Sequence, residues 1–364
     1  MKIIHCADLH LDSRMSAHLD GEKRKKRRAE LLATFDRLLD YAVESGVYAV
    51  LIAGDLFDTP VISKTARAAV LDGIRSCPDV AFYYLKGNHD SDNFLEGEEV
   101  PDNLYTFNDS WTSYALGDTD SVILSGIELT ESNCKSAAAA LIPDINKINI
   151  VMLHGQESRT GSDMADQIPI RDYQNKGIDY MALGHIHARK EAKLDARGVY
   201  VYPGALEGRG FDECGEKGFM LLDIDEEAGT IKREFVPFAS RILREVHVDI
   251  TGATSSPEAL KKVEEAISEL KIPETSLVKV TLEGEMDAEC EFDLEYILNR
   301  LEGRFFYVKV KDGTGIRVNY DDYALDRSLK GEFVRKVMAS ELSSEDKAAI
   351  IRYGIQAIAG EEIS

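Results

Sequence analysis

The sequence predicts a layered α/β fold followed by a smaller α+β unit. Up to about residue 240, short apolar runs first alternate with amphipathic stretches and then follow one another in series, the pattern of an α/β sandwich. The stretches 27–45 and 63–76 are expected to be helices. In the first, the apolar residues recur at helical spacing: Leu31, Leu32, Phe35, Leu38, Leu39 and Ala42.

The expected strands are short runs rich in β-branched and aromatic residues, bounded by Gly, Asp or Asn. They are 2–7, 48–54, 81–87, 121–127, 148–155, 179–185, 198–204 and 218–224. The polar segments 91–102 and 155–167 are expected to be surface loops.

The pattern changes near Arg241. Three strand-like and two helix-like runs follow (244–250, 256–271, 276–282, 292–302 and 305–310), and then two helical stretches, 322–341 and 344–359. Ser343 or Ser344, with Asp346 close behind, is the expected N-cap of the last helix. We therefore expect a catalytic domain over 1–240, an α+β capping domain over 241–320, and a helical segment over 321–364. The apolar stripe of this segment would either pack against its own domain or form a surface for a partner.

Composition narrows the class of protein. The 364 residues are 44% hydrophobic and 30% charged, as in globular enzymes, and no apolar run approaches the roughly 20 residues of a membrane span. The net charge of -22 argues against non-specific coating of nucleic acid but leaves a local site open. Five scattered cysteines and the lack of a secretory signal at the start predict reduced thiols in the cytoplasm.

Several predicted strands end in residues that bind metals. The motifs, in chain order, are Asp8-Leu9-His10, Gly54-Asp55-Leu56-Phe57-Asp58, Gly87-Asn88-His89-Asp90, His154-Gly155 and Gly184-His185-Ile186-His187. Because the carboxyl ends of parallel strands meet at one edge of a sheet, we expect these residues to converge there.

The residue types suit a pair of divalent cations. Carboxylates, an amide oxygen and imidazoles favour Mn, Fe, Zn or Mg, and an aspartate can bridge two ions. Each motif alone is weak, since a lone histidine is usually structural. The ordered set of five motifs is much more specific, and it predicts a dinuclear metal site.

This ordered set resembles the calcineurin-like metallophosphoesterase superfamily, and within it the DNA-repair branch of SbcD-like exonucleases and YhaO-type proteins. The resemblance rests on ADLHLDS (7–13), GDLFDT (54–59), KGNHDS (86–91), LGHIH (183–187), YPG (202–204) and GRGFDECGEKG (208–218). It covers residues 1 to about 240 and is weaker beyond. It implies an α/β/β/α sandwich with a smaller capping domain.

The resemblance also implies a role for each residue. One metal would be held by Asp8, His10, Asp55 and His187, and the other by Asp55, Asn88, His154 and His185. His89 would lie over the scissile phosphate and either stabilise its charge or protonate the leaving oxygen, and Asp90 would orient His89. The two ions, most often Mn and about 3.5–4 Å apart, would activate a hydroxide that attacks phosphorus in line.

Asp58 departs from part of the family. Archaeal and eukaryotic relatives often have histidine at this position, and aspartate matches the bacterial members, so the balance of exonuclease and endonuclease activity stays open. We expect Asp58 to hold a ligand histidine in place. The resemblance further implies an SbcC-like ATPase of the SMC type as partner, bound by the C-terminal helices, and a homodimer.

Three functions compete. The first is a metal-dependent DNA nuclease of double-strand-break repair or recombination. The second is a phosphatase or phosphodiesterase acting on a small phosphate ester, and the third is a scaffold whose site has decayed. The intact ligand set argues against the third. The roughly 120 residues after the core argue against the second, although both parts of the chain are acidic.

Six consecutive basic residues stand out in this acidic chain: Lys23, Arg24, Lys25, Lys26, Arg27 and Arg28. One interpretation is a solvated helix start. The other is a set of phosphate contacts on a loop over 11–26 beside the metal site, which we favour because positive charge opposes the dipole at a helix N-terminus. Arg209 is a further candidate that would contact either a phosphate or a loop carboxylate.

Overall fold

The computed structural model describes residues 1–15, 19–59, 61–158, 164–287, 293–317, 323 and 325–359. The chain divides into two compact units, Met1–Arg241 and Ile242–Ser364, called here the first and second units.

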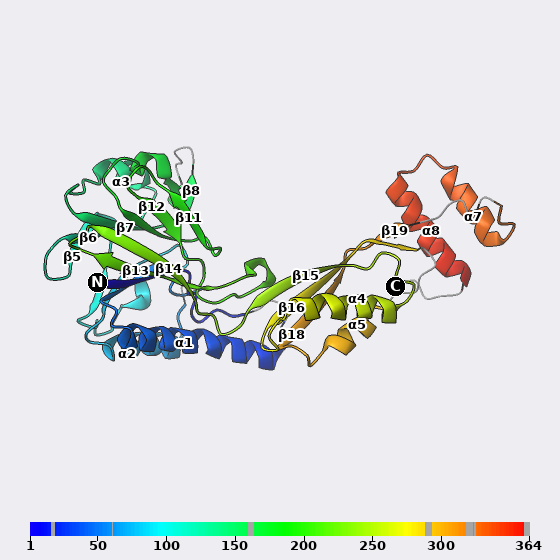
Figure 1. The fold of residues 1–364 in the computed structure, drawn as a ribbon, viewed down its shortest axis with the longest axis horizontal. Helices are drawn as coiled ribbons and strands as arrows, with labels where there is room; N and C mark the ends of the chain where they lie inside the picture. Colours follow the sequence, from blue (N-terminus) through cyan, green and yellow to red (C-terminus); the bar gives the residue numbers. More distant parts are fainter. Residues whose placement is uncertain are drawn as a thin grey trace. The chain divides into compact units, whose positions relative to one another are not determined.

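Two six-stranded sheets form the first unit (Figure 1). The first sheet has the order β14 (Thr230–Pro237), β13 (Gly218–Asp225), β1 (Lys2–Cys6), β2 (Ala49–Ala53), β3 (Ala81–Leu85), β4 (Leu104–Thr106). The second has the order β11 (Lys190–Lys193), β12 (Val199–Tyr202), β10 (Tyr180–Gly184), β7 (Ile148–His154), β6 (Val122–Gly126), β5 (Thr112–Leu116). In both sheets the central strands are parallel, so their carboxyl ends share an edge.

Apolar side chains fill three layers of the first unit. One core lies between the sheets and includes Ile3, Leu51 and Ile150. Helices α1 (Gly21–Glu44) and α2 (Lys64–Arg75) cover the outer face of the first sheet, and α3 (Cys134–Ala140) with the short helix η2 (Ile170–Tyr173) covers that of the second. The predicted α/β/β/α sandwich is therefore confirmed.

Shorter elements lie in the connections. Strands β8 (Gln156–Ser158) and β9 (Gln167–Pro169) pair with each other, and η1 (Asp92–Phe94) and η3 (Phe211–Glu213) are single turns. The predicted loop 91–102 contains η1, whose Phe94 is buried against Phe57. The middle of the other predicted loop, 159–163, lies outside the described residues.

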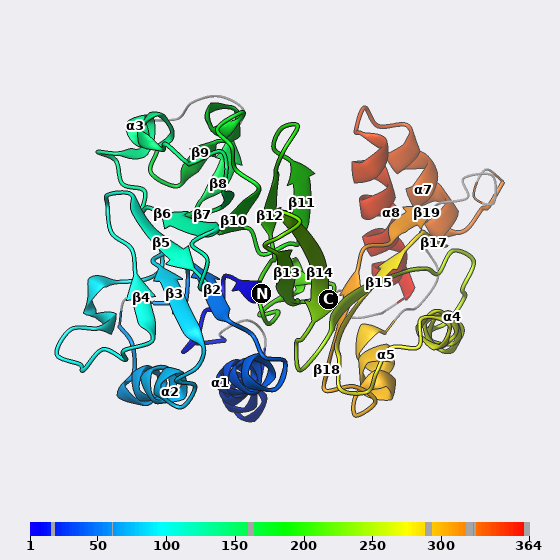
Figure 2. The ribbon, with the colours of Figure 1, turned by 60° about the vertical axis from the view of Figure 1, so that its left-hand side comes forward.

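The second unit has a parallel sheet of β15 (Leu243–Asp249), β16 (Leu277–Glu283) and β18 (Tyr307–Asp312). Helices α4 (Ser256–Glu269) and α5 (Leu294–Leu301) pack on it, and β17 (Glu285–Asp287) pairs with β19 (Gly315–Arg317). Figure 2 shows α7 (Leu329–Met338) and α8 (Ser344–Ala359) side by side, packed around Val334, Ile351 and Ile355. The predicted boundary at 320/321 and the roles given to the parts stay predictions.

Two predicted helices have different starts. Helix α1 begins at Gly21 and not at 27, because the Asp20 side chain accepts the Lys23 backbone N–H at 2.8 Å and caps the helix. The basic run therefore lies within α1, and the expected loop over 11–26 is wrong. Helix α7 begins at Leu329, and the predicted start at 322 lies outside the described residues.

Two further expectations concern the whole chain. No helix in the described parts is long and apolar enough to cross a membrane. The four cysteines that the structure describes are free thiols, and Cys290 lies outside the described residues.

Candidate metal centre

Five strands bring the predicted metal ligands together. From the first sheet, β1 leads to Asp8 and His10, β2 to Asp55 and Asp58, and β3 to Asn88, His89 and Asp90; from the second sheet, β7 ends in His154 and β10 leads to His185 and His187. These strands are neighbours within each sheet. The convergence at the carboxyl ends therefore follows from the fold.

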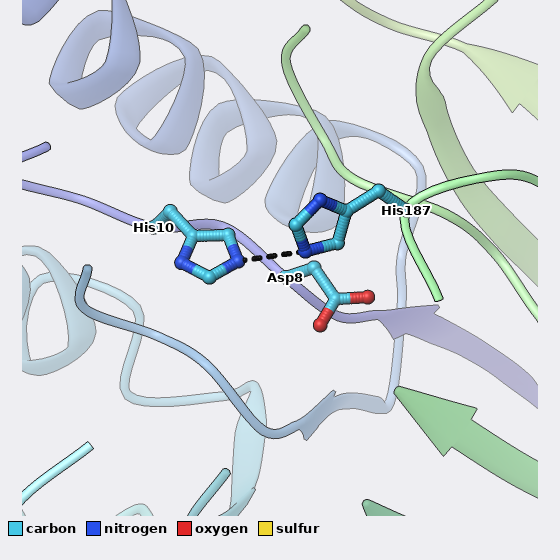
Figure 3. Close-up of side chains that lie close together, drawn as sticks. All are labelled: Asp8, His10 and His187. Atoms are coloured by element: carbon cyan, nitrogen blue, oxygen red, sulfur yellow. Dashed lines mark hydrogen bonds between the residues drawn. The ribbon is translucent and has the colours of Figure 1, made fainter. Parts of the chain in front are cut away.

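One group of side chains comprises Asp8, His10 and His187 (Figure 3). The Nε2 atoms of the two imidazoles face each other at 3.0 Å, and Asp8 lies beside them. Asp8 and His10 are buried, while His187 is partly exposed. One cation would fit between these atoms.

A second group surrounds Asp55. Its Oδ2 lies 3.5 Å from His154 Nε2 and 3.7 Å from His10 Nε2, so this carboxylate stands between the two groups. Asn88 Oδ1 lies 3.0 Å from both His154 Nε2 and His185 Nδ1. This is the arrangement that two ions sharing Asp55 would need, and the assignment of ligands stays a prediction.

The chemistry of these atoms fits a cation. His154 Nδ1 donates to the carbonyl oxygen of Ala53 at 2.9 Å, which in the neutral imidazole leaves Nε2 as a lone pair. This nitrogen faces the acceptor oxygens of Asn88 and Asp55. His154 and Asp55 are buried, and acceptors that converge in a buried place are costly unless a cation or a proton lies among them.

Burial and neighbouring charges shift the pKa values of the predicted ligands. Burial raises the pKa of Asp8 to about 6 and lowers that of His10 to about 4. Burial opposes the charge on His154 too, but the hydrogen bond and charge of Asp55 raise its pKa to about 9. For Asp55, burial is outweighed by His154 and His10, and its pKa falls well below the usual range.

The predicted ligands hold unusual backbone conformations. Asp8, His10, Asp55 and His185 have φ values of 53°, 45°, 52° and 101°, in the left-handed region that favours glycine. Such strain persists only where the surroundings impose it, and it gathers at functional sites.

His89 and Asp58 lie together, but Asp90 does not have its predicted role. His89 is exposed, and its Nδ1 pairs with the carbonyl oxygen of Asp58 at 3.0 Å, so Asp58 and not Asp90 orients the ring. The Asp90 carboxylate instead accepts the backbone N–H groups of Leu56, Phe57 and Gly87. These bonds join the loop that follows β2 to the loop that follows β3, so the Asp90 carboxylate binds backbone groups and not the His89 ring.

Glu213 is a site residue that the sequence analysis missed. This buried carboxylate accepts the Nδ1–H of His187 at 2.7 Å, which leaves Nε2 facing His10. Burial opposes its ionisation, but the hydrogen bond from His187 and the charge of Arg209 lower its pKa to about 2. The only signal was its place within the stretch 208–218.

The predicted DNA contacts differ in exposure. Arg24, Lys25, Lys26 and Arg28 are exposed on α1, and Lys23 is half-buried against Asp20 at 2.9 Å. Arg27 is fully buried: its guanidinium donates to Glu207 at 3.1 Å and to the Gly208 carbonyl at 2.8 Å. The expectation that Arg27 contacts a phosphate is therefore wrong, because no phosphate can reach it.

Arg209, expected to contact either a phosphate or a carboxylate, contacts carboxylates. Its guanidinium donates to the carboxylates of Asp58 and Glu213, and its side chain is 19% exposed. The predicted phosphate contact by Arg209 is corrected accordingly, since its donors serve carboxylates of the site.

Two cavities open beside the centre. One of about 390 Å³ is lined by Asn88, His154, Lys86 and Thr130, among others. The other, of about 220 Å³, is lined by Asp58, Arg209 and Glu213 with residues 13–15. A substrate therefore has room on either side of the ligand groups.

Comparison with known proteins gives consistent matches. A family model described as calcineurin-like phosphoesterase matches residues 1–189. The chain is 29% identical to the uncharacterized metallophosphoesterase YhaO of Bacillus subtilis, over 78% of this chain and 72% of that protein. It is 24% identical to the DNA double-strand break repair protein Mre11 of Saccharolobus solfataricus, over 100% of this chain and 96% of that one. For the Mre11 of Sulfolobus acidocaldarius the identity is 25%, over 78% and 75%.

Proposed function

The chain belongs to the calcineurin-like phosphoesterase family, and we propose that it is a nuclease that hydrolyses DNA phosphodiesters in double-strand-break repair or recombination. It is a phosphoesterase whose family uses two divalent metal ions. The choice of DNA as substrate is supported by the relatives named Mre11, one of which matches the full length of this chain, second unit included.

The observation that carries the proposal is the pair of neighbouring ligand groups, Asp8 with His10 and His187 and Asp8 with Asp55 and His154, with the exposed His89 beside them. The His89 and His10 rings stand edge to face with their centroids 5.0 Å apart. An exposed imidazole next to the buried Asp8, His10 and Asp55 can reach the phosphate of a bound substrate.

The residues of the chain would divide the work as follows. Bound divalent ions would lower the pKa of water and offset the negative charge of the phosphodiester. We assign one ion to Asp8, His10, Asp55 and His187, and the other to Asp55, Asn88, His154 and His185, with Mn as the expected metal. The Asp58 carbonyl oxygen accepts the Nδ1–H of His89, and the Nε2–H of the imidazolium form of this ring would give its proton to the leaving oxygen.

The nuclease proposal is tested with Mn-loaded protein and linear duplex DNA. We expect shortening of the DNA ends, and we expect His89→Ala to reduce the rate about 100-fold or more, within the usual range for a general acid. Circular dichroism and Mn titration of the variant serve as controls for folding and loading. Intact DNA after incubation with well-loaded wild-type protein would contradict the proposal.

A small phosphate ester is the second candidate substrate. The cavity of about 390 Å³ next to Asn88 and His154 is in the size range of small-ligand sites and favours it. Hydrolysis of bis-p-nitrophenyl phosphate by protein that leaves DNA uncut would select this function over the first.

The exposed basic residues of α1 are the proposed DNA contacts, with Arg27 withdrawn. Arg28 pairs with the Asp12 side chain at 3.1 Å, and the other exposed residues of the run are Arg24, Lys25 and Lys26. Replacing these three by Gln is expected to weaken DNA binding and to flatten its dependence on salt, since each phosphate contact releases counterions. If the dependence of DNA binding on salt did not change, the basic residues would be only a solvated start of the helix.

An SMC-type ATPase is the proposed partner, with α7 and α8 as its contact. In support, Leu329 and Tyr353 are 70% and 47% exposed on these helices. Leu329→Glu is expected to abolish co-elution with such an ATPase and to leave phosphodiester hydrolysis intact. A homodimer and a cytoplasmic location stay predictions.

A further inference from the structure

Arg209 lies where two supports of the metal centre meet. It follows β12 by a short loop and precedes η3, and its side chain is mostly buried. Nη1 contacts Asp58 Oδ1, and on the other side Nη2 and Nε lie 3.1 and 3.3 Å from Glu213 Oε1. The Arg209 backbone N–H also donates to Glu213 Oε2 at 2.8 Å. One guanidinium thus joins two carboxylates.

Each of those carboxylates lies beside the Nδ1 atom of one predicted ligand histidine. Asp58 Oδ1 lies 3.2 Å from His10 Nδ1, and Glu213 Oε1 lies 2.7 Å from His187 Nδ1. Glu213 forms a hydrogen bond with His187 Nδ1, whereas Asp58 lies at ion-pair distance from His10 Nδ1, which has no hydrogen-bond partner among the described residues. Both rings face each other through Nε2, and these two atoms are 3.0 Å apart. The orientation of both histidines in the group of Figure 3 therefore depends on the same pair of carboxylates.

Without the positive charge of Arg209, the carboxylates of Asp58 and Glu213 would repel each other and move away from His10 and His187. A guanidinium suits the position because its planar fork donates in several directions at once and stays charged. The loop that carries it is fixed as well: Arg27 of α1 donates to the Gly208 carbonyl, and Thr34 donates to Glu207 at 2.7 Å.

We propose that Arg209 is a positioning residue for one half of the metal centre: through Asp58 and Glu213 it sets the orientation of His10 and His187. The other half has a support of its own, since the Ala53 carbonyl accepts the Nδ1–H of His154. Loss of Arg209 therefore weakens one metal position and spares the other.

The test is Mn binding to the full chain without substrate, by calorimetry and electron paramagnetic resonance. In Arg209→Gln we expect one Mn to bind at wild-type affinity and the other about 10–100-fold more weakly, the usual effect of losing such a support. At intermediate Mn the variant shows the spectrum of isolated ions, where the wild type shows a coupled pair. Arg209→Lys recovers part of the affinity because it keeps the charge but loses the fork.

Arg233→Gln is the matched control. Arg233 lies on β14, outside the site, and pairs with Glu191 of β11 at 3.1 Å, so this variant should bind both ions like the wild type. Wild-type affinity for both ions in Arg209→Gln, or equal weakening of both, would overturn the proposal. Unfolding temperatures in EDTA establish that the variants fold, and if Arg209→Gln does not, Arg209→Lys must still show a loss confined to one ion. Since no substrate is used, failure to cleave DNA leaves this result standing.

Discussion

At the scale of single residues, close approach of backbone to ligand side chains sets the site. A Cβ atom on Gly87 would lie 2.2 Å from Asp55 Oδ1 and 2.5 Å from its backbone nitrogen, and one on Gly184 would lie 1.9 Å from the Ala53 carbonyl oxygen. The glycines that stand next to the ligand motifs in the sequence are thus required by space.

Gly87→Ala is therefore expected to displace the Asp55 carboxylate. A shift of this kind costs about 100-fold in rate, which hydrolysis of bis-p-nitrophenyl phosphate would measure alongside Mn titration. Gly21→Ala is the control, since nothing lies within 4 Å of a Cβ there, and it should change neither quantity. Unaltered Mn affinity and rate in Gly87→Ala would show that Asp55 does not need this space.

His5 gives a prediction about pH. It is fully buried beside the Tyr180 hydroxyl at 2.8 Å, and burial lowers its pKa to about 3. An unfolded histidine has a pKa of about 6.5, so between these values only the unfolded chain takes up the proton. The stability that His5 contributes is present above pH 6.5 and is lost as the pH falls toward 3.

Between pH 7 and pH 5 this loss amounts to about 2 kcal/mol of unfolding free energy. Urea unfolding in EDTA should show it in the wild type and not in His5→Asn, whose amide can still meet Tyr180. His247→Asn, at a half-exposed position, should follow the wild type. If the free energy of unfolding fell equally with pH in the wild type and in His5→Asn, groups other than His5 would be responsible for the acid sensitivity.

At the scale of elements, α1 shows what a pattern of residues predicts and what it does not. Its apolar spacing predicted the helix, and its true start depended on one cap, Asp20, hidden before a run of like charges. Arg27 cannot be told from its basic neighbours by sequence, because its partner Glu207 is 180 residues away. Only the fold separates the buried arginine from the exposed ones.

Arg27→Ala should consequently destabilise the first unit far more than alanine substitutions of the neighbouring basic residues. It leaves the buried Glu207 carboxylate without its charged partner, at a cost of about 3–5 kcal/mol in the free energy of unfolding. Lys25→Ala, on the exposed side of the same helix, should stay within about 0.5 kcal/mol of the wild type. Urea unfolding measures both, and similar small effects would mean that water or another group takes the place of Arg27.

At the scale of the whole molecule, the order of motifs was enough to predict where the site lies. Ligand residues at the ends of parallel strands must meet once those strands are neighbours, and β1, β2 and β3, like β7 and β10, are neighbours. The supports could not be predicted in the same way. Glu213 and Arg209 act through side-chain contacts across the fold, and such contacts leave no periodic trace in a sequence.

Removal of metal should therefore act on one unit of the molecule. All the described ligand groups belong to the first unit, so Mn at 100 times its dissociation constant would stabilise that unit by about 2.7 kcal/mol for each site. Hydrogen exchange followed by mass spectrometry, with EDTA or with Mn, would then show slower exchange in β1, β2, β7 and β10 and no change in β15, β16 and β18. Asp8→Asn, which lacks one ligand charge, should show a smaller difference. Equal slowing in both units would mean that they unfold together, and no slowing in the first would contradict a metal site at these strand ends.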